Sequence, residues 1–211
     1  MMLHERVSIM TLKDVYEPGE DSFLLAKVVE ETAFGKVLDM CTGSGIQGIV
    51  AALKGCDVTF SDVDETALEC AANNAEANHV KGKFVKSDLF QNIKGRYNTI
   101  IFNPPYLPSE PSGRAEDPRL RALDGGKNGR RFIDRFIDSY KEHVLEDHIV
   151  LIVESSFNGY ARDVRSLKAK VVAKAHYFFE DIVVLEFGRL PKSASGIDEI
   201  RGSAPFIYQD K

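Results

Sequence analysis

Residues 35 to 53 read GKVLDMCTGSGIQGIVAAL, and this stretch decides the fold. Gly35 to Asp39 predicts a short apolar strand that ends in an acid, and the apolar run Ile46 to Leu53 predicts a helix. A loop with Gly43 and Gly45 joins them. A glycine turn of this kind places backbone N–H groups and a helix N-terminus at the carboxyl edge of a sheet, where nucleotide-like ligands bind.

The rest of the chain continues this alternation of strands and helices. Strands are expected at Asp57 to Asp62, Lys83 to Lys86, Asn98 to Phe102 and Ile149 to Glu154, and helices at Asp21 to Glu31, Glu65 to Asn78 and Phe132 to Val144. Glu20, Asp21 and Ser22 are available to cap the first of these helices. Near the end, Ala173 to Phe179 and Ile182 to Phe187 predict two strands joined by a Glu-Asp turn. The predicted fold is α/β, a doubly wound, Rossmann-like sheet with a C-terminal antiparallel β-hairpin.

One insert interrupts this pattern. Residues 107–131 contain several proline, glycine and charged residues with little periodicity. A loop of this length inside a compact domain usually has a function. We therefore expect a single domain over residues 1–211, in which residues 107–131 form a lid on the substrate side.

The composition excludes several classes of protein. Lysine and arginine total 27 and aspartate and glutamate 32, so the net charge is −5 and the whole molecule offers phosphate-rich partners no long-range attraction. The cysteines Cys41, Cys56 and Cys70 form no Cys-x-x-Cys pair and fit neither a disulfide framework nor a self-contained zinc site. No apolar run is long enough for a signal peptide or a membrane span. We expect a soluble cytoplasmic protein without a metal or a membrane partner.

The glycine loop does not fit a dinucleotide. A dinucleotide site would read G-x-G-x-x-G, whereas this loop begins with the carboxylate of Asp39, which suits an ammonium better than a diphosphate. S-adenosylmethionine carries such an ammonium. Asp62, after the second strand, could accept from two ribose hydroxyls, and Asp88, after the third, from the adenine amino group while Leu89 covers the ring. Any one of these acids could be only a turn or a cap, but three after successive strands indicate a cofactor site.

The tetrapeptide Asn103-Pro104-Pro105-Tyr106 directly follows an apolar strand. Its prolines fix the backbone and remove two N–H donors, so carbonyls here lack their usual local partners. The Asn103 side-chain oxygen and the Pro104 carbonyl could hold both N–H bonds of a planar NH2 group, with Tyr106 stacked on its plane. The tetrapeptide could also be only a turn that ends the strand. In register after Asp88, we interpret it as the catalytic element that positions a nitrogen for methylation.

Together these residues resemble the HemK/PrmC-type class I methyltransferases, in particular their short archaeal and eukaryotic branch. The resemblance covers most of the chain. It rests on Val15 to Leu25 (VYEPGEDSFLL), Asp39 to Gly45, Asp62, Asp88-Leu89, Asn103 to Tyr106 and Asp124 to Gly129 (DGGKNG). The Asn-Pro-Pro-Tyr element also occurs in adenine and cytosine amino-methyltransferases, whereas the N-terminal element is more selective for this branch.

The resemblance implies a reaction, partners and site residues. The branch methylates the glutamine of a Gly-Gly-Gln motif in translation termination factors, with S-adenosylmethionine as cofactor and a small zinc-binding activator as partner subunit. By this resemblance, the cofactor is lined by Ser22, Asp39, Asp62, Asp88 and Leu89, and the glutamine amide is held by Asn103, Pro104, Pro105 and Tyr106. We also expect Cys41, Gly43, Gly45 and Asn103 to line the cofactor. The chain departs from the family at Cys41, where glycine is usual. The backbone there must accommodate a Cβ atom.

Two other functions fit part of the pattern. An adenine-N6 methyltransferase of DNA or RNA would present the same two N–H bonds. It is disfavoured by the net charge and favoured by the cationic residues Arg114, Arg119, Arg121, Lys127, Arg130 and Arg131. The chain could also be an inactive, cofactor-binding subunit of a methyltransferase complex, against which the retained acids and Asn103 argue. If an activator binds, we expect it to cover the strand Asp57 to Ser61 at an exposed edge of the sheet.

Overall fold

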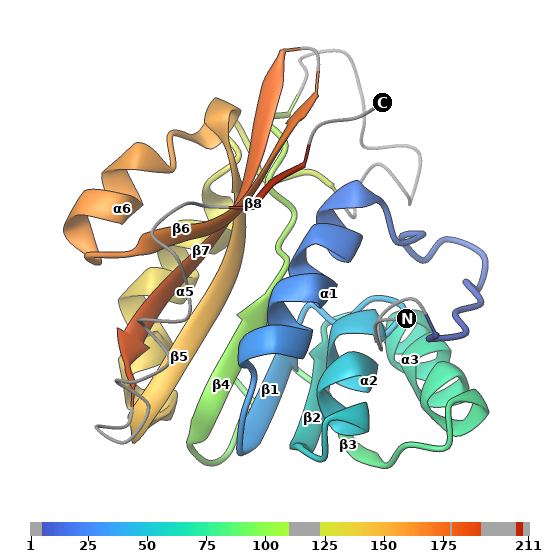
Figure 1. Ribbon diagram of the computed structural model, residues 1–211. Helices are drawn as coiled ribbons and strands as arrows, with labels where there is room; N and C mark the ends of the chain where they lie inside the picture. Colours follow the sequence, from blue (N-terminus) through green and yellow to red (C-terminus); the bar gives the residue numbers. More distant parts are fainter. Residues whose placement is uncertain (1–5, 110–122, 178, 191–205, 209–211) are drawn as a thin grey trace.

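The computed structural model describes residues 6–109, 123–177, 179–190 and 206–208. Its centre is an eight-stranded sheet of order β3-β2-β1-β4-β5-β7-β6-β8 (Figure 1). The strands are β1 Lys36–Met40, β2 Asp57–Asp62, β3 Gly82–Lys86, β4 Tyr97–Phe102, β5 Val144–Ser155, β6 Lys170–Tyr177, β7 Glu180–Arg189 and β8 Phe206–Tyr208. The helices are α1 Glu20–Thr32, α2 Ile46–Leu53, α3 Glu65–Ala77, α5 Arg131–Ser139 and α6 Ala161–Ser166, with short 3-10 helices η3 Tyr140–His143 and η4 Ser156–Asn158.

The strand order confirms the doubly wound α/β prediction. β1 pairs in parallel with β2 on one side and β4 on the other, so the chain reverses its direction of travel across the sheet between β3 and β4. β7 runs antiparallel between β5 and β6, which confirms the C-terminal hairpin. The hairpin turn differs in detail. Glu180 and Asp181 already pair with Tyr177 and His176, so the predicted Glu-Asp turn is wrong and these two residues begin β7.

The predicted edge strand is also wrong. β2 pairs with β1 through one side and with β3 through the other, so Asp57 to Ser61 is an interior strand. The reason is topological. A right-handed crossover through α3 adds the next parallel strand outside β2 and continues the sheet in the same direction. Among the described residues, β3 forms that end of the sheet.

Helices cover both faces of the sheet. In Figure 1, α1 and α2 lie in front of the strands and α5 lies behind them. The Phe136 ring of α5 stacks on Phe102 of β4 with 4.4 Å between ring centroids, and Phe90 packs beside it at 5.5 Å. Within the described ranges, no helix combines the length and apolar character needed to cross a bilayer.

Two segments differ from their predicted roles. Gly19 is the N-cap of α1 and no side chain caps this end, so the predicted capping by Glu20, Asp21 and Ser22 is wrong. Asp21 and Ser22 are instead buried. Of the predicted lid at 107–131, the last residue already begins α5 and residues 110–122 lie outside the described residues. The two ends of the insert pair with each other: the Leu107 amide donates to the Leu123 carbonyl and the Gly125 amide to the Leu107 carbonyl.

Close packing between α2 and β2 predicts a stability defect. A Cβ atom on Gly48 of α2 would lie 2.3 Å from the fully buried Phe60 ring of β2. Gly48→Ala should therefore lower the free energy of unfolding by about 1–2 kcal/mol, because overpacking outweighs the better helix propensity of alanine. Urea unfolding measures this change. In the Phe60→Leu background the same substitution should cost less, and equal costs in the two backgrounds would contradict the packing argument.

Candidate active site at the carboxyl edge of the sheet

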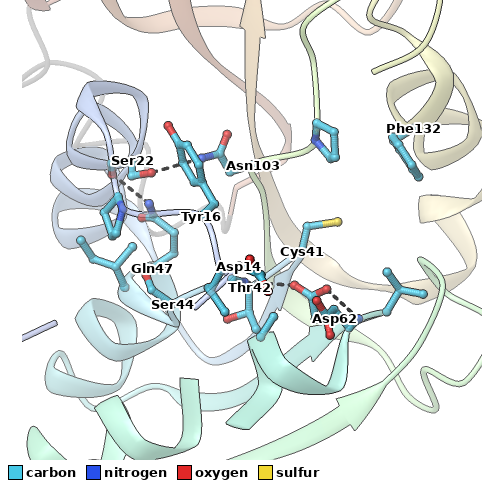
Figure 2. A pocket seen from close by; sticks show the side chains of 18 residues that line it. Asp14, Tyr16, Ser22, Cys41, Thr42, Ser44, Gln47, Asp62, Asn103 and Phe132 are labelled. Atoms are coloured by element: carbon cyan, nitrogen blue, oxygen red, sulfur yellow. Dashed lines mark hydrogen bonds between the residues drawn. The ribbon is translucent and has the colours of Figure 1, made fainter. Parts of the chain in front are cut away.

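A cavity of about 300 Å³ lies at the carboxyl ends of β1, β2 and β4. This is the place where the strand order reverses, and ligands of open α/β sheets bind there. Cys41, Asp62 and Asn103 reach it from the three strand ends. Figure 2 shows Tyr16, Ser22 and Asn103 close together on one side of the cavity and Phe132 on the other.

Asp39, at the end of β1, holds the glycine loop through its buried side chain. Its side chain is 1% exposed, and one carboxylate oxygen accepts from the Thr42 hydroxyl and from the Gly48 amide at 2.9 Å. Burial raises the pKa of Asp39 to about 7, against the lowering effect of these two bonds. Asp39 is not among the residues that line the cavity, so its predicted contact with an ammonium stays a prediction.

The loop itself has a left-handed backbone. Cys41, Gly43 and Gly45 have φ angles of 57°, 52° and 85°. Only glycine adopts this region without strain, which gives a physical reason for glycine at the position of Cys41 in the resembling family. Cys41 and Gly43 line the cavity, whereas Gly45 caps α2. Burial raises the pKa of the Cys41 thiol well above its ordinary value, so the side chain is a neutral wall of the cavity.

Asp62 is the acid that faces the cavity. One of its oxygens accepts from the Gly43 amide at 3.0 Å and the other from the Asp64 amide at 3.1 Å. Burial raises the pKa of Asp62, while these backbone bonds lower it and so favour the carboxylate. A carboxylate with lone pairs left over at a strand end suits the diol of a ribose.

Asp88 and Leu89 follow β3, which pairs with the strand that ends in Asp62. Asp88 forms an ion pair with Arg135 at 2.9 Å, and Leu89 is buried with a φ angle of 48°. Neither residue is among those that line the cavity, whereas Val63 and Phe132 supply apolar surface there. The predicted adenine contacts of Asp88 and Leu89 therefore stay predictions.

Asn103 presents its side-chain oxygen without a partner. Its Nδ2 atom donates to Asp21 Oδ2 at 3.0 Å and lies 3.5 Å from the Ser22 hydroxyl, whereas its Oδ1 atom is buried and makes no hydrogen bond. Buried polar atoms are nearly always paired, so this oxygen is an acceptor available to a ligand. Pro105 lines the cavity beside Asn103, while Pro104 and Tyr106 are buried outside the lining set.

A glycine turn packs against the tetrapeptide from the other side. A Cβ atom on Gly125 would lie 2.7 Å from the Pro105 carbonyl oxygen, and one on Gly129 would lie 2.2 Å from the Tyr106 carbonyl oxygen. The following residue, Arg130, has a side chain only 6% exposed. It is anchored in a cluster of acids by ion pairs to Asp134 at 2.8 Å, Asp163 at 2.7 Å and Glu154 at 3.5 Å. The turn is thus fixed between a buried charge cluster and the backbone of the tetrapeptide.

Sequence reasoning missed the wall formed by the N-terminal segment. Asp14, Val15, Tyr16 and Pro18 all line the cavity. Asn74 of α3 holds this segment, because its amide exchanges hydrogen bonds with the Met10 backbone and also donates to the Ser44 carbonyl at 2.9 Å. Gln47 adds a buried amide that donates to the Ser22 carbonyl at 2.8 Å. The N-terminal element Val15 to Leu25 was the sequence feature from which this wall could have been predicted.

The residues present fit S-adenosylmethionine. Asp62 supplies acceptors, and Val63, Ile46 and Phe132 supply apolar surface. A volume of about 300 Å³ is at the lower end of the ~300–1,000 Å³ that small-molecule sites occupy.

Comparisons with known proteins point to one chemistry. Residues 8–113 match the family model described as methyltransferase small domain. The chain is 34% identical over 192 residues to a Methanocaldococcus jannaschii protein named "Putative protein N5-glutamine methyltransferase", covering 88% of this chain and 98% of that protein. It is 32% identical over 142 residues to the release factor glutamine methyltransferase of Agrobacterium fabrum, covering 58% of this chain and 48% of the relative.

A solved structure shares the fold. The ribosomal protein L11 methylase of Lactobacillus delbrueckii subsp. bulgaricus superposes with a TM-score of 0.60 over 84% of this chain and 82% of that chain. Its sequence identity is 17%, so the likeness concerns the fold alone.

The geometry of Asp62 predicts the effect of removing one of its acceptors. Asp62→Asn should weaken binding of S-adenosylhomocysteine by about tenfold or more, because one amide oxygen cannot replace two carboxylate oxygens that already accept from Gly43 and Asp64. Titration calorimetry measures the affinity. Asp57→Asn, at the exposed start of the same strand, is the matched control and should bind like the wild type. Equal affinities for all three proteins would remove Asp62 from the cofactor site.

Proposed function

This chain belongs to the HemK/PrmC-type methyltransferases, and we propose that it transfers a methyl group from S-adenosylmethionine to the side-chain amide nitrogen of a glutamine. We further propose that the glutamine lies in the Gly-Gly-Gln motif of a translation termination factor in the cytoplasm. The release factor methyltransferase among the relatives and the N-terminal VYEPGEDSFLL element support this substrate. Both relatives described above carry names of glutamine methyltransferases.

One observation carries the proposal: the buried Asn103 oxygen has no hydrogen-bond partner. An amide NH2 group has two N–H bonds to place. The Asn103 oxygen can accept one of them, and the prolines that follow leave backbone carbonyls free of local N–H donors for the other. The planar nitrogen would then be held by its hydrogens, with its π face left open toward the cavity.

Positioning is the main contribution of the protein. S-adenosylmethionine, when bound, supplies an activated methyl group on a positively charged sulfur. The amide nitrogen would provide the electron pair of the new N–C bond while the methyl–sulfur bond breaks with its pair on sulfur, so that S-adenosylhomocysteine leaves. The nitrogen then loses one proton to solvent. Orientation of two reactants can lower a barrier by ~7–11 kcal/mol, whereas one neutral hydrogen bond contributes about 0.5–1.5 kcal/mol. The rigid backing of the tetrapeptide by Gly125, Gly129 and Arg130 serves this alignment.

The adenine-N6 alternative has less support in the described residues. Of the cationic residues near the lid, Arg130 is buried in ion pairs and so is not available to a phosphate. Lys127 and Arg131 are exposed, while Arg114, Arg119 and Arg121 lie outside the described residues. Nucleic-acid binding depends on such cations.

We also propose that the zinc-binding activator adds to the β3 edge of the sheet. In the described residues β3 pairs only with β2, and strand edges with free N–H and C=O groups accept further strands. Phe84 of β3 is 38% exposed and stacks on Phe60 at 4.8 Å between centroids. An open hollow lined by Glu76, His79, Val80 and Phe84 lies beside it. An apolar partner surface would cover this ring.

The substrate proposal predicts a specific methylation. Labelled methyl groups should pass from S-adenosylmethionine to a purified termination factor, and the Gln→Ala variant of its Gly-Gly-Gln motif should take up none. Asn103→Ala should abolish the transfer and leave S-adenosylhomocysteine affinity nearly unchanged, since Asn103 acts in the chemical step. Label that persists in the Gln→Ala factor would refute the substrate, and transfer to an adenine-containing oligonucleotide would favour the alternative.

The partner proposal predicts that activity on the factor rises when the activator is added. Phe84→Asp should prevent this rise, because a charge on the β3 edge opposes apolar cover. Leu53→Asp is the matched control, since Leu53 is also 38% exposed but lies on α2. Specific activity is measured with and without activator. Equal values for the wild type would exclude the requirement, and activation of Phe84→Asp equal to that of Leu53→Asp and the wild type would exclude the β3 edge.

A further inference from the structure

Asp21 is a buried acid with a dense set of donors. Its side chain is 3% exposed, in the first turn of α1. It accepts hydrogen bonds from the Tyr16 hydroxyl at 2.9 Å, the Ser22 hydroxyl at 3.3 Å and Asn103 Nδ2 at 3.0 Å. A carboxyl group buried this deeply is costly unless it is fully hydrogen-bonded. Three donors on two oxygens match the acceptor-only character of the carboxylate.

These donors belong to different parts of the site. Tyr16 comes from the N-terminal wall of the cavity, Ser22 from α1, and Asn103 from the tetrapeptide after β4. Burial raises the pKa of Tyr106, another residue of the tetrapeptide, and the neighbouring Asp21 charge raises it further, so the phenol keeps its proton. Asp21 thus connects the tetrapeptide to the cofactor wall. It does not cap α1, because Gly19 is the N-cap and no side chain bonds to that end.

The contact with Asn103 fixes which way its amide points. An asparagine amide has one accepting and one donating end, which differ little in shape. With Nδ2 on the Asp21 carboxylate, the accepting Oδ1 atom is turned to the position where it has no protein partner. The reversed amide would set an oxygen against a carboxylate, which is repulsive, and would offer an NH2 group to the NH2 group of the substrate.

The charge of Asp21 has a second effect. A donor that bonds to a carboxylate is polarised, and within one amide this makes the opposite oxygen a stronger acceptor. As the methyl group is transferred, positive charge develops on the substrate amide. A negative charge fixed behind Asn103 in a buried environment stabilises that change more than it stabilises the neutral amide.

We propose that Asp21 is a positioning residue for methyl transfer, which orients the Asn103 amide and strengthens its oxygen as the acceptor of the substrate N–H group. This role rests on the proposed glutamine methylation for its catalytic consequence. The orientation of Asn103, however, is a property of the chain by itself and can be measured without any substrate.

Asp21→Asn tests the proposal, with Glu20→Gln as the matched control. The neighbouring Glu20 is exposed, and its substitution removes the same charge one residue away. The first readout is the pair of side-chain 15N–1H resonances of Asn103 in the full chain, assigned by their absence in Asn103→Ala. They should move in Asp21→Asn and stay in place in Glu20→Gln. Unchanged Asn103 resonances in folded Asp21→Asn would overturn the proposal, whether or not a methyl acceptor is known.

The second readout is kinetic. Single-turnover methyl transfer by Asp21→Asn should slow by about ten- to a hundredfold, the change expected when one charge-assisted hydrogen bond is lost. S-adenosylhomocysteine affinity should stay within about threefold, whereas a loss confined to this affinity would show a merely structural role. Asp21→Glu keeps the charge and should recover part of the rate, and it replaces Asp21→Asn if thermal melting finds the latter unfolded. An inactive wild type with displaced Asn103 resonances in Asp21→Asn would count against the substrate alone.

Discussion

The pairing of β1 between β2 and β4 is the constraint on which the rest of the structure depends. Because the chain leaves β1 toward β2 and later returns to β4 on its other side, the loops after β1 and β4 diverge at the carboxyl edge. That divergence leaves a crevice that neither loop fills. The glycine loop, Asp62 and Asn103 are therefore brought together by topology, although as many as 62 positions separate them in the sequence.

The sequence predicts those features that depend on residues close together along the chain. The strands and most helices follow from apolar periodicity, and Asp62 and Asn103 follow from their place directly after a strand. The role of Asp21 could not be predicted, because its bond to Asn103 joins residues 82 positions apart and a polar residue in a first helical turn is usually a cap. The prediction that Asp57 to Ser61 forms an edge of the sheet was wrong for a related reason. Which strand ends a sheet depends on where the next crossover places its strand.

Buried acids organise both sides of the site. Asp39 holds the glycine loop and Asp21 holds the tetrapeptide. Glu154 and Asp163 anchor Arg130, which follows the glycine turn Gly125 to Gly129. Burial raises the pKa of Asp39 and of Glu154, so each such group costs stability to ionise. Such costs are common at functional sites, where the benefit of rigidly placed polar groups exceeds the loss of folding stability. This arrangement explains why an enzyme without an acid-base catalyst still needs several buried carboxyl groups.

The same geometry leaves the choice of substrate to the cavity walls. A glutamine amide and an adenine amino group both present a planar nitrogen with two N–H bonds, so the acceptors of Asn103 and its prolines cannot distinguish them. The distinction must come from shape and charge around the nitrogen. Here the walls include Tyr16, Pro105 and Phe132, and the buried cation Arg130 is neutralised by acids. An extended peptide side chain needs no phosphate contact to enter such a site, whereas a flipped nucleotide does.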